Sequence, residues 1–316
     1  MIPGFGMNVV LKHQSESDLR TYIDSLKKLK TEWIRLELNY FDPIPEVVLD
    51  FFVREVHQSG IKILGLLTGL VPGTFINCTA PGLKFWNPLD RLDSYIEFVT
   101  KYVSRYQSSI DHWEIWNEPN TLRFWIKKPN SSEFVRLIKE TSPIIRSLQP
   151  NSTIVMGGIM GDDTNVYAPF QKIDFLRECL EKGIDDFVDI YNFHPYIPAC
   201  YMSWKKKEFY TTEIKRSINL YLEKYHDVNK PHWISEIGIC PLWVRVSQRE
   251  IAEVLFELYQ YSRSLNLHYF LWTLTDFNDK EYSRLNPETA FGVLNWELEE
   301  KELYKGLVED FSKLNS

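Results

Sequence analysis

Two glutamates stand where apolar, strand-like segments of the chain end, and together they could do acid–base chemistry. Glu118 follows the segment 112–116 in the string WNEPN, and Glu236 follows the segment 232–235 in the string ISEIG. Two carboxyl groups that converge on one cavity can cleave a glycosidic bond, because one protonates the leaving oxygen while the other attacks the sugar or activates water. A glutamate at a strand end is more often a surface or helix-capping residue, so the pair needs support from its neighbours.

Polar residues in or after other predicted strands supply that support. Arg35 lies in the segment 33–38, and His194 and Tyr196 directly follow the segment 188–193. An alternative role for Arg35 is a salt bridge to Glu37 or a network inside the fold. The remaining histidines show no metal-ligand spacing, and the sequence contains no His-Glu-x-x-His string, so it predicts neither a metal site nor a cofactor.

The elements that must position these residues alternate strictly along the chain. Strands are expected at 4–9, 33–38, 61–67, 112–116, 153–157, 188–193, 232–235 and 268–274. Helices are expected at 15–30, 45–57, 90–106, 131–147, 174–182, 211–225, 248–265 and 302–314. Alternation of this kind indicates a parallel sheet with crossover helices, either an open doubly wound sheet or a closed barrel.

Eight strand–helix units favour the barrel. Units averaging roughly 40 residues match the usual size of this fold, and the first strand is not followed by the glycine fingerprint of a dinucleotide-binding sheet. We therefore predict an α/β protein with a single (β/α)8 TIM barrel over residues 1–316. Glu118 and Glu236 would then lie on the fourth and seventh strands, at the carboxyl face where active sites of such barrels occur.

The long connections after the third, sixth and eighth strands are rich in aromatic residues, which suit stacking on sugar rings. They span 68–89, 195–210 and 275–301, and several of their aromatics could instead pack the loops onto the barrel. The aromatic residues concerned are Phe75, Phe85, Trp86, Tyr196, Tyr201, Trp204, Phe277, Tyr282, Phe291 and Trp296. Side-by-side aromatic platforms predict an open cleft for several sugar units, with a pocket around one terminal sugar as the alternative.

The strings WNEP around Glu118 and SEIG around Glu236 resemble the acid/base and nucleophile signatures of the clan A glycoside hydrolases. The resemblance spans the chain. The run EIWNEPN, a Gly-Gly pair after the fifth strand and the string FHPY after the sixth look most like glycoside hydrolase family 39 and its relatives, with family 5 as a close competitor. The family 39 xylosidases carry an additional β-sandwich, whereas the last element expected in these 316 residues is the eighth helix, so we expect endo-acting or compact relatives to be more similar.

This resemblance implies a retaining (β/α)8 enzyme in which Glu118 is the acid/base and Glu236 the nucleophile. It also implies substrate-binding roles for five further residues: Arg35, Asn117, His194, Tyr196 and Trp272. Asn117 would bind the sugar 2-hydroxyl, and Trp272 would present its face to the sugar, with barrel packing as the alternative for the tryptophan. Apolar walls, for which Trp116 and Trp125 are candidates, would keep Glu118 protonated near neutral pH.

The expected function is therefore hydrolysis of a β-linked oligo- or polysaccharide by double displacement. An exo-acting β-glycosidase, a transglycosidase with the same covalent intermediate, and a carbohydrate-binding barrel without catalysis remain alternatives. Two carboxyl groups at the expected strand ends argue against the binding protein, because a binding site gains little from a close carboxylate pair.

Composition excludes several other classes of protein. The 316 residues are 44% hydrophobic and 25% charged, with a net charge of -7, so the chain has no basic field for nucleic acid. Its apolar runs are too short to cross a bilayer, which predicts a soluble protein without a membrane partner. The first residues do not form a signal peptide, which leaves a cytoplasmic or a processed secreted protein. Four scattered cysteines are expected as thiols in or near the core.

Overall fold

The computed structural model describes residues 4–13, 15–69, 87–125, 128–161, 174–197, 205–280 and 286–315. Across these residues the strands form one curled parallel sheet, ordered β5-β4-β3-β2-β1-β9-β8-β7-β6. The strands are β1 Phe5–Val9, β2 Trp33–Asn39, β3 Lys62–Thr68, β4 His112–Ile115, β5 Thr153–Met156, β6 Ile159–Met160, β7 Tyr191–His194, β8 His232–Ile237 and β9 His268–Leu271.

The sheet closes on itself at two seams. The first and last strands pair in parallel, since Phe5 of β1 lies opposite Tyr269 of β9. On the other side, Val155 of β5 forms a parallel bridge to Ile190, and the Met156 N–H donates to the Ile190 carbonyl oxygen at 2.9 Å. The two-residue strand β6 pairs only with β7 in the described part of the chain. Eight strands therefore form the barrel, as predicted, and β6 is a short addition at its rim.

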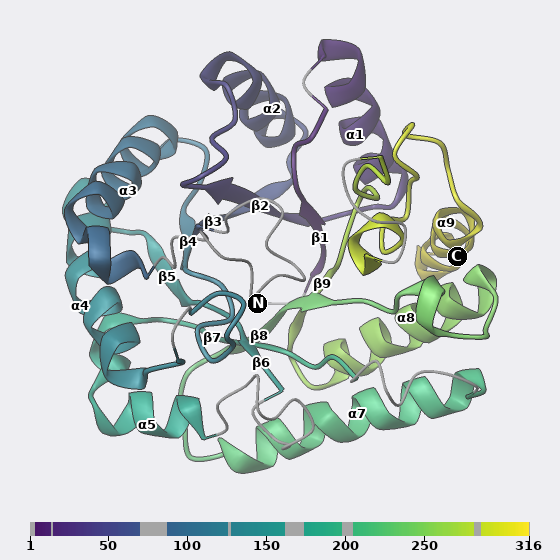
Figure 1. The fold of residues 1–316 in the computed structure, drawn as a ribbon. Coiled ribbons are helices and arrows are strands. Elements are labelled where there is room, and N and C mark those ends of the chain that lie inside the picture. Colours follow the sequence, from purple (N-terminus) through teal and green to yellow (C-terminus); the bar gives the residue numbers. More distant parts are fainter. Residues whose placement is uncertain are drawn as a thin grey trace.

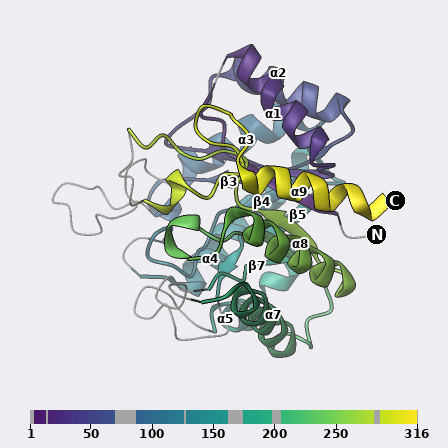
Figure 2. The same cartoon turned by 90° about the vertical axis from the view of Figure 1, so that its right-hand side faces the viewer.

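Helices surround this barrel in a ring (Figure 1). They are α1 Glu16–Lys28, α2 Glu46–Gln58, α3 Leu92–Tyr106, α4 Ser131–Leu148, α5 Phe175–Glu181, α7 Lys207–Lys224, α8 Gln248–Ser264 and α9 Glu302–Ser312. Figure 2 shows α8 and α9 side by side along one flank of the barrel, in agreement with their direct contact. No helix of the described residues is long and apolar enough to span a membrane.

Local signals in the sequence explain where several helices begin. Ser247 and Glu250 form a reciprocal capping box at the start of α8, which satisfies two backbone N–H groups that the helix itself leaves unpaired. The Asn130 side chain accepts from the N–H groups of Ser132 and Glu133 at the start of α4. Each of these helices buries one apolar face against the barrel.

Alternation along β2 separates the two faces of the barrel wall. Ile34, Leu36 and Leu38 pack into the large core between strands and helices. Trp33, on the opposite face, joins a smaller apolar cluster with Leu64, Val155, Ile190, Trp233 and Phe270. Because these side chains come from strands all around the sheet, the cluster fills the barrel interior near the amino ends of the strands. Arg35 and Glu37 continue the same inward face toward the carboxyl ends.

The structure differs from the predicted elements mainly in their bounds. The strand predicted at 188–193 begins only at Tyr191, because the Asp189 carboxylate accepts the Ile154 N–H at 2.7 Å and replaces a ladder bond there. The helix predicted from residue 211 begins at Lys207. Cys179 and Cys240 are buried thiols, as expected. The predicted loop aromatics Phe75, Phe85, Trp86, Tyr201, Trp204 and Tyr282 lie outside the described residues, as do Cys78 and Cys200.

Candidate active site

Glu118 lies just beyond the carboxyl end of β4, in a tightly shaped backbone segment. Its N–H donates to the Gly158 carbonyl oxygen at 2.9 Å, and its carbonyl oxygen accepts from the Thr121 hydroxyl at 3.0 Å. Both Trp116 and Glu118 have positive φ angles, 70° and 39°, a conformation that costs a residue other than glycine about 1–3 kcal/mol. The surrounding hydrogen bonds hold this conformation and keep the Glu118 side chain in the barrel mouth, where the residue is 2% exposed.

Glu236 lies near the carboxyl end of β8 and is held by two donors. The Arg35 guanidinium donates through Nη1 to Glu236 Oε2 at 3.0 Å, and the Tyr196 hydroxyl donates to Oε1 at 3.1 Å. Each carboxylate oxygen therefore has its own donor, one of them charged. Hydrogen bonds of this kind favour the ionised form of a carboxyl group and fix its orientation.

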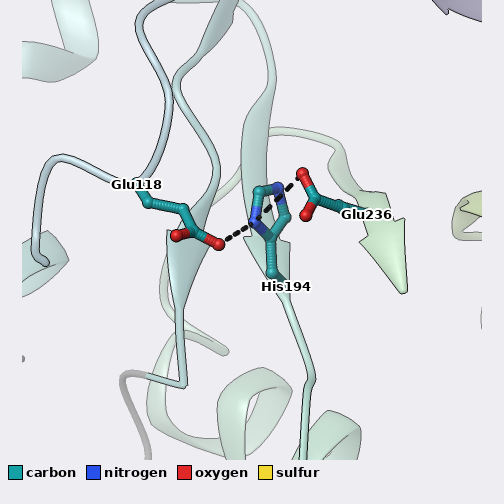
Figure 3. A group of neighbouring side chains, drawn as sticks. All are labelled: Glu118, His194 and Glu236. Carbon is teal, nitrogen blue, oxygen red and sulfur yellow. Dashed lines mark hydrogen bonds and ion pairs between the residues drawn. The ribbon is translucent and has the colours of Figure 1, made fainter. Parts of the chain in front are cut away.

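The imidazole of His194 lies between the two carboxyl groups (Figure 3). Its Nδ1 is 3.0 Å from Glu118 Oε1 and 3.9 Å from Glu236 Oε2, while Nε2 is 3.0 Å from the Ser235 hydroxyl. One carboxylate oxygen of each glutamate and a ring nitrogen of the histidine all lie within 4.8 Å of one another. Two glutamates predicted from distant strings of the sequence thus converge on one histidine.

Burial shapes the protonation of all three groups. It raises the pKa of Glu118 to about 7, against the opposing influence of Arg123 and Arg35. Burial also raises the pKa of Glu236, which His194 and Arg35 oppose, and it lowers the pKa of His194 to about 4. His194 is therefore neutral near pH 7. Since the guanidinium contacts Glu236 and not Glu118, the geometry favours a protonated Glu118 beside an ionised Glu236.

Arg35 is the centre of the network that connects these groups. Besides Glu236, it donates to the Asn117 amide oxygen at 2.6 Å and to the Asn8 amide oxygen at 3.0 Å. Among the described residues its ion-pair partners are Glu114 and Glu236. No ion pair between Arg35 and Glu37 occurs in the described part of the chain, and the interior network does occur. This network includes Glu236, so it is compatible with the predicted role of Arg35 in the site. Since Arg35 takes the oxygen of Asn117, the amide group of this residue is fixed with its nitrogen as the remaining donor.

Glu114 is the main residue that the sequence reasoning missed. It lies on β4, four positions before Glu118, and is completely buried. Its carboxylate accepts from Arg35 Nε at 2.7 Å and from Nη2 at 2.9 Å, and also from the Asn192 amide at 3.0 Å. The available signal was its position between Trp113 and Ile115 in a barrel strand, because an acidic residue among buried apolar residues needs a buried partner of opposite charge.

Trp272 follows β9 and packs at the barrel mouth. Its indole N–H donates to Glu288 Oε2 at 2.9 Å, and it shares a small apolar cluster with Phe291, against which Tyr196 packs. The peptide bond between Trp272 and Thr273 is cis. Glu288, a second residue that sequence reasoning missed, also accepts from Arg123 Nη2 at 3.2 Å. All seven predicted site residues therefore lie at one end of the barrel, joined by hydrogen bonds or packing.

The remaining aromatics of the sequence analysis take different places. Trp116 and Trp125 are fully buried and pack edge to face, with ring centroids 6.2 Å apart. Phe291 is buried in the cluster around Trp272, while Phe277 packs against that cluster. Trp296 is partly buried and lies against the ring of His13, with centroids 4.2 Å apart.

Glu118, His194 and Glu236 offer three atoms that a cation could bind. His194 Nδ1 is already hydrogen-bonded to Glu118 at 3.0 Å, and the Arg35 guanidinium donates to Glu236 at 3.0 Å. A fixed positive charge so close to the site opposes a metal ion electrostatically. The arrangement suits proton transfer and nucleophilic attack better than metal coordination.

Comparisons with known proteins point to the same chemistry. A family model described as Cellulase (glycosyl hydrolase family 5) matches residues 80–278, more than half of the chain. A curated relative, the beta-xylosidase of Geobacillus stearothermophilus, is 29% identical over 107 residues. That match covers 33% of this chain and 20% of the relative. The family model thus agrees with the resemblance to clan A glycoside hydrolases that the sequence strings indicated, while the xylosidase is similar to only a third of the chain.

Solved structures share the fold at low sequence identity. GH5_18 from Streptomyces cattleya matches with a TM-score of 0.73 and 12% identity, covering 99% of this chain and 80% of that one. A family 39 glycoside hydrolase from Bacteroides cellulosilyticus WH2 matches with a TM-score of 0.68 and 18% identity, covering 98% of this chain and 64% of that one. The chain thus spans less than two thirds of the length of the family 39 enzyme. These likenesses confirm the TIM-barrel fold.

Proposed function

The chain belongs to the cellulase family, glycosyl hydrolase family 5, and on this premise we propose that it cleaves β-glycosidic bonds by double displacement with retention. The observation that carries the proposal is the pair Glu118 and Glu236, in which one oxygen of each carboxyl group lies within 4.8 Å of one oxygen of the other. Retaining enzymes keep their carboxyl groups about 5–5.5 Å apart, whereas inverting enzymes need about 6.5–9.5 Å to admit a water molecule. The observed spacing supports direct attack on the sugar.

In the first step Glu236 is the nucleophile and Glu118 the acid. A carboxylate oxygen of Glu236 forms a bond to the anomeric carbon while the bond to the leaving oxygen breaks. The proton of Glu118 moves to that oxygen, so the departing alcohol leaves neutral. The protein then holds a glycosyl ester on Glu236, and Glu118 has become a carboxylate.

In the second step Glu118 acts as base. It takes a proton from water, whose oxygen attacks the anomeric carbon and releases Glu236 as a carboxylate. Two inversions at one carbon return the β configuration to the product. A pKa of about 7 for Glu118 suits both halves of this cycle, because an acid–base group works best when its pKa is near the working pH.

The surrounding residues bind and orient the sugar in this proposal. Arg35 and Tyr196 hold Glu236 ionised and fixed in direction. The Asn117 amide nitrogen serves the 2-hydroxyl, a contact that strengthens as positive charge develops on the ring. Trp272 supplies an apolar platform, and Glu288 fixes its plane through the indole N–H.

For the substrate we propose a β-linked oligo- or polysaccharide bound in an open cleft and cut internally. The partial match to a beta-xylosidase favours exo action on a short β-glycoside as the alternative. Sizing the products released from xylan, mannan and glucan separates the two modes. Internal cleavage gives mixed oligosaccharides early in the reaction, and exo action gives one small sugar throughout.

Variants of the two glutamates test the mechanism. Glu236→Gln should abolish turnover of all substrates, because no glycosyl ester can form. Glu118→Ala should lose less activity on aryl glycosides with good leaving groups, because their departure needs no acid. Azide, which needs no base to attack the glycosyl ester, should restore part of the activity that remains lost. NMR of the first product formed reports the anomer directly. An α product, or equal loss for good and poor leaving groups in Glu118→Ala, would refute the assigned roles.

A further inference from the structure

A third carboxyl group, that of Glu37, reaches the barrel mouth and has no part in the proposed mechanism. On β2 it stands two residues after Arg35, so its side chain leaves the strand on the same inward face. Two residues of strand advance about 6–7 Å, which places Glu37 one layer above Arg35 toward the carboxyl ends. Unlike the buried Arg35, it is partly exposed.

Three cations act on this carboxyl group through their charges, and none of them forms an ion pair with it in the described part of the chain. Burial raises the pKa of Glu37, and Lys12, Arg35 and Arg123 oppose that effect through their charges. Within the described residues these cations form their ion pairs with other carboxylates: Lys12 with Asp42, Arg35 with Glu114 and Glu236, and Arg123 with Glu288. The Asn39 amide donates to Glu37 Oε1 at 3.2 Å. No donor to Oε2 occurs in the same part of the chain.

The two outer cations belong to the rim around Trp272. Lys12 is held by Asp42 at 2.9 Å and stands over the ring of Phe277, whose centroid is 6.5 Å from that of Trp272. Arg123 is paired with Glu288, the residue that also accepts the Trp272 N–H. Glu37 therefore faces the space beside the proposed sugar platform.

A sugar hydroxyl fits such a place, because it donates one hydrogen bond and accepts others. The Glu37 carboxylate can accept the hydrogen bond that a hydroxyl donates. A cation that is not paired with this carboxylate can donate a hydrogen bond to the oxygen of the same hydroxyl. We propose that Glu37 is a specificity-determining residue, which accepts hydrogen bonds from hydroxyl groups of the sugar on Trp272 and selects neutral sugars over uronic acids. This inference rests on the proposed function. A uronate carboxylate at this place would meet Glu37 as a like charge, whereas a hydroxyl forms a charge-assisted hydrogen bond.

The variant Glu37→Gln tests this selection, since it removes the charge and keeps the size. With activated aryl β-glycosides of xylose, glucose and mannose and their disaccharides, kcat/KM for the preferred neutral substrate should fall about 10- to 100-fold, as expected for one lost charged hydrogen bond. The ratio of aryl β-glucuronide to neutral activity should rise, because Lys12 and Arg123 then face the uronate without Glu37. Asp111→Asn is the matched control, with the same charge change on an exposed residue at the amino end of β4; it should leave both quantities within about twofold, as for a surface substitution.

Monodeoxy substrates test the same contact with the unaltered protein. The wild type should have a lower kcat/KM for the analogue that lacks the recognised hydroxyl than for the parent substrate. This loss should equal the loss that Glu37→Gln causes with the parent substrate. The two changes combined should lose little more than either alone, because both remove one interaction. Additive losses with every deoxy analogue, or an unchanged glucuronide ratio in Glu37→Gln, would overturn the inference. Its failure is distinct from failure of the proposed function, which would appear as no cleavage of any glycoside by the wild type.

Discussion

Replacing Glu114 by glutamine should destabilise the protein strongly, although the two side chains have nearly the same shape. The group is fully buried, and everything around its carboxylate donates. Arg35 contributes two N–H groups at 2.7 and 2.9 Å, Gly158 its backbone N–H at 3.1 Å, and Asn192 its amide at 3.0 Å. The amide nitrogen of a glutamine would have to face one of these donors.

The size of the expected loss in stability follows from the positive charge of Arg35, which Glu114→Gln would leave buried with one carboxylate fewer. Arg35 is 1% exposed and would keep Glu236 as its one remaining ion-pair partner among the described residues. Breaking a buried ion pair by removing one partner costs about 3–5 kcal/mol. At this chain length each kcal/mol corresponds to about 2 °C in Tm, so Glu114→Gln should lower Tm by about 6–10 °C.

Thermal unfolding followed by circular dichroism measures this shift, with Glu133→Gln as the control. The carboxylate of Glu133 accepts from the neutral groups Asn87 Nδ2 at 2.7 Å and Trp125 Nε1 at 3.0 Å, both on one oxygen. A glutamine carbonyl can accept both, so the expected cost is about 1 kcal/mol or less. If Glu114→Gln melts within about 2 °C of wild type, or no lower than the control, the argument that Glu114 neutralises a buried guanidinium is refuted.

Three further predictions concern activity. The value of kcat/KM should fall as the pH rises through about 7, because burial raises the pKa of Glu118 to about 7 and only its protonated form is an acid. A kcat/KM that is constant from pH 6 to pH 9 would contradict this assignment. Gly158→Ala should lower kcat/KM about tenfold or more, because the added Cβ would lie 2.2 Å from His194 Nε2 and displace that positioned side chain. Circular dichroism should show that the fold is retained. Wild-type activity of this variant would show that His194 need not stay in place. Replacing Trp86, Trp204 or Trp296 by alanine should lower kcat/KM for long oligosaccharides more than for short ones, because platforms of an open cleft contribute binding energy only to long substrates. The measurement is kcat/KM as a function of chain length, and an unchanged chain-length preference would exclude the role.

Much of the fold could be predicted from the order of elements, because local patterns carry it. Alternating apolar runs and amphipathic stretches predict eight strand–helix units, and parallel strands with crossover helices can close into a barrel. The predicted bounds of a strand were less accurate where a side chain takes the place of a backbone hydrogen-bond acceptor, as the Asp189 carboxylate does before β7. No local pattern predicts this hydrogen bond, since Asp189 and the donor, the Ile154 N–H of β5, are 35 residues apart.

The strings around Glu118 and Glu236 also determined the expected chemistry, because each places a carboxyl group at the carboxyl end of a strand. What they left open was the environment of each group. Arg35 reaches Glu236 across 201 positions of sequence, and Glu114 sets the direction of that guanidinium from a third strand. The assignment of Glu118 as the buried acid and of Glu236 as the hydrogen-bonded nucleophile depends on these contacts.

The sequence by itself therefore determined the barrel, the two candidate catalytic glutamates and the residue types near them. Only the tertiary structure decided which cation pairs with which carboxylate, how Glu288 holds Trp272, and that Glu37 faces the mouth without an ion-pair partner in the described part of the chain. The reason is physical. Strand order and inward direction follow from local periodicity, whereas a pKa or an ion pair depends on distances of a few ångströms between side chains, and these are set only when all eight strands close around a shared interior.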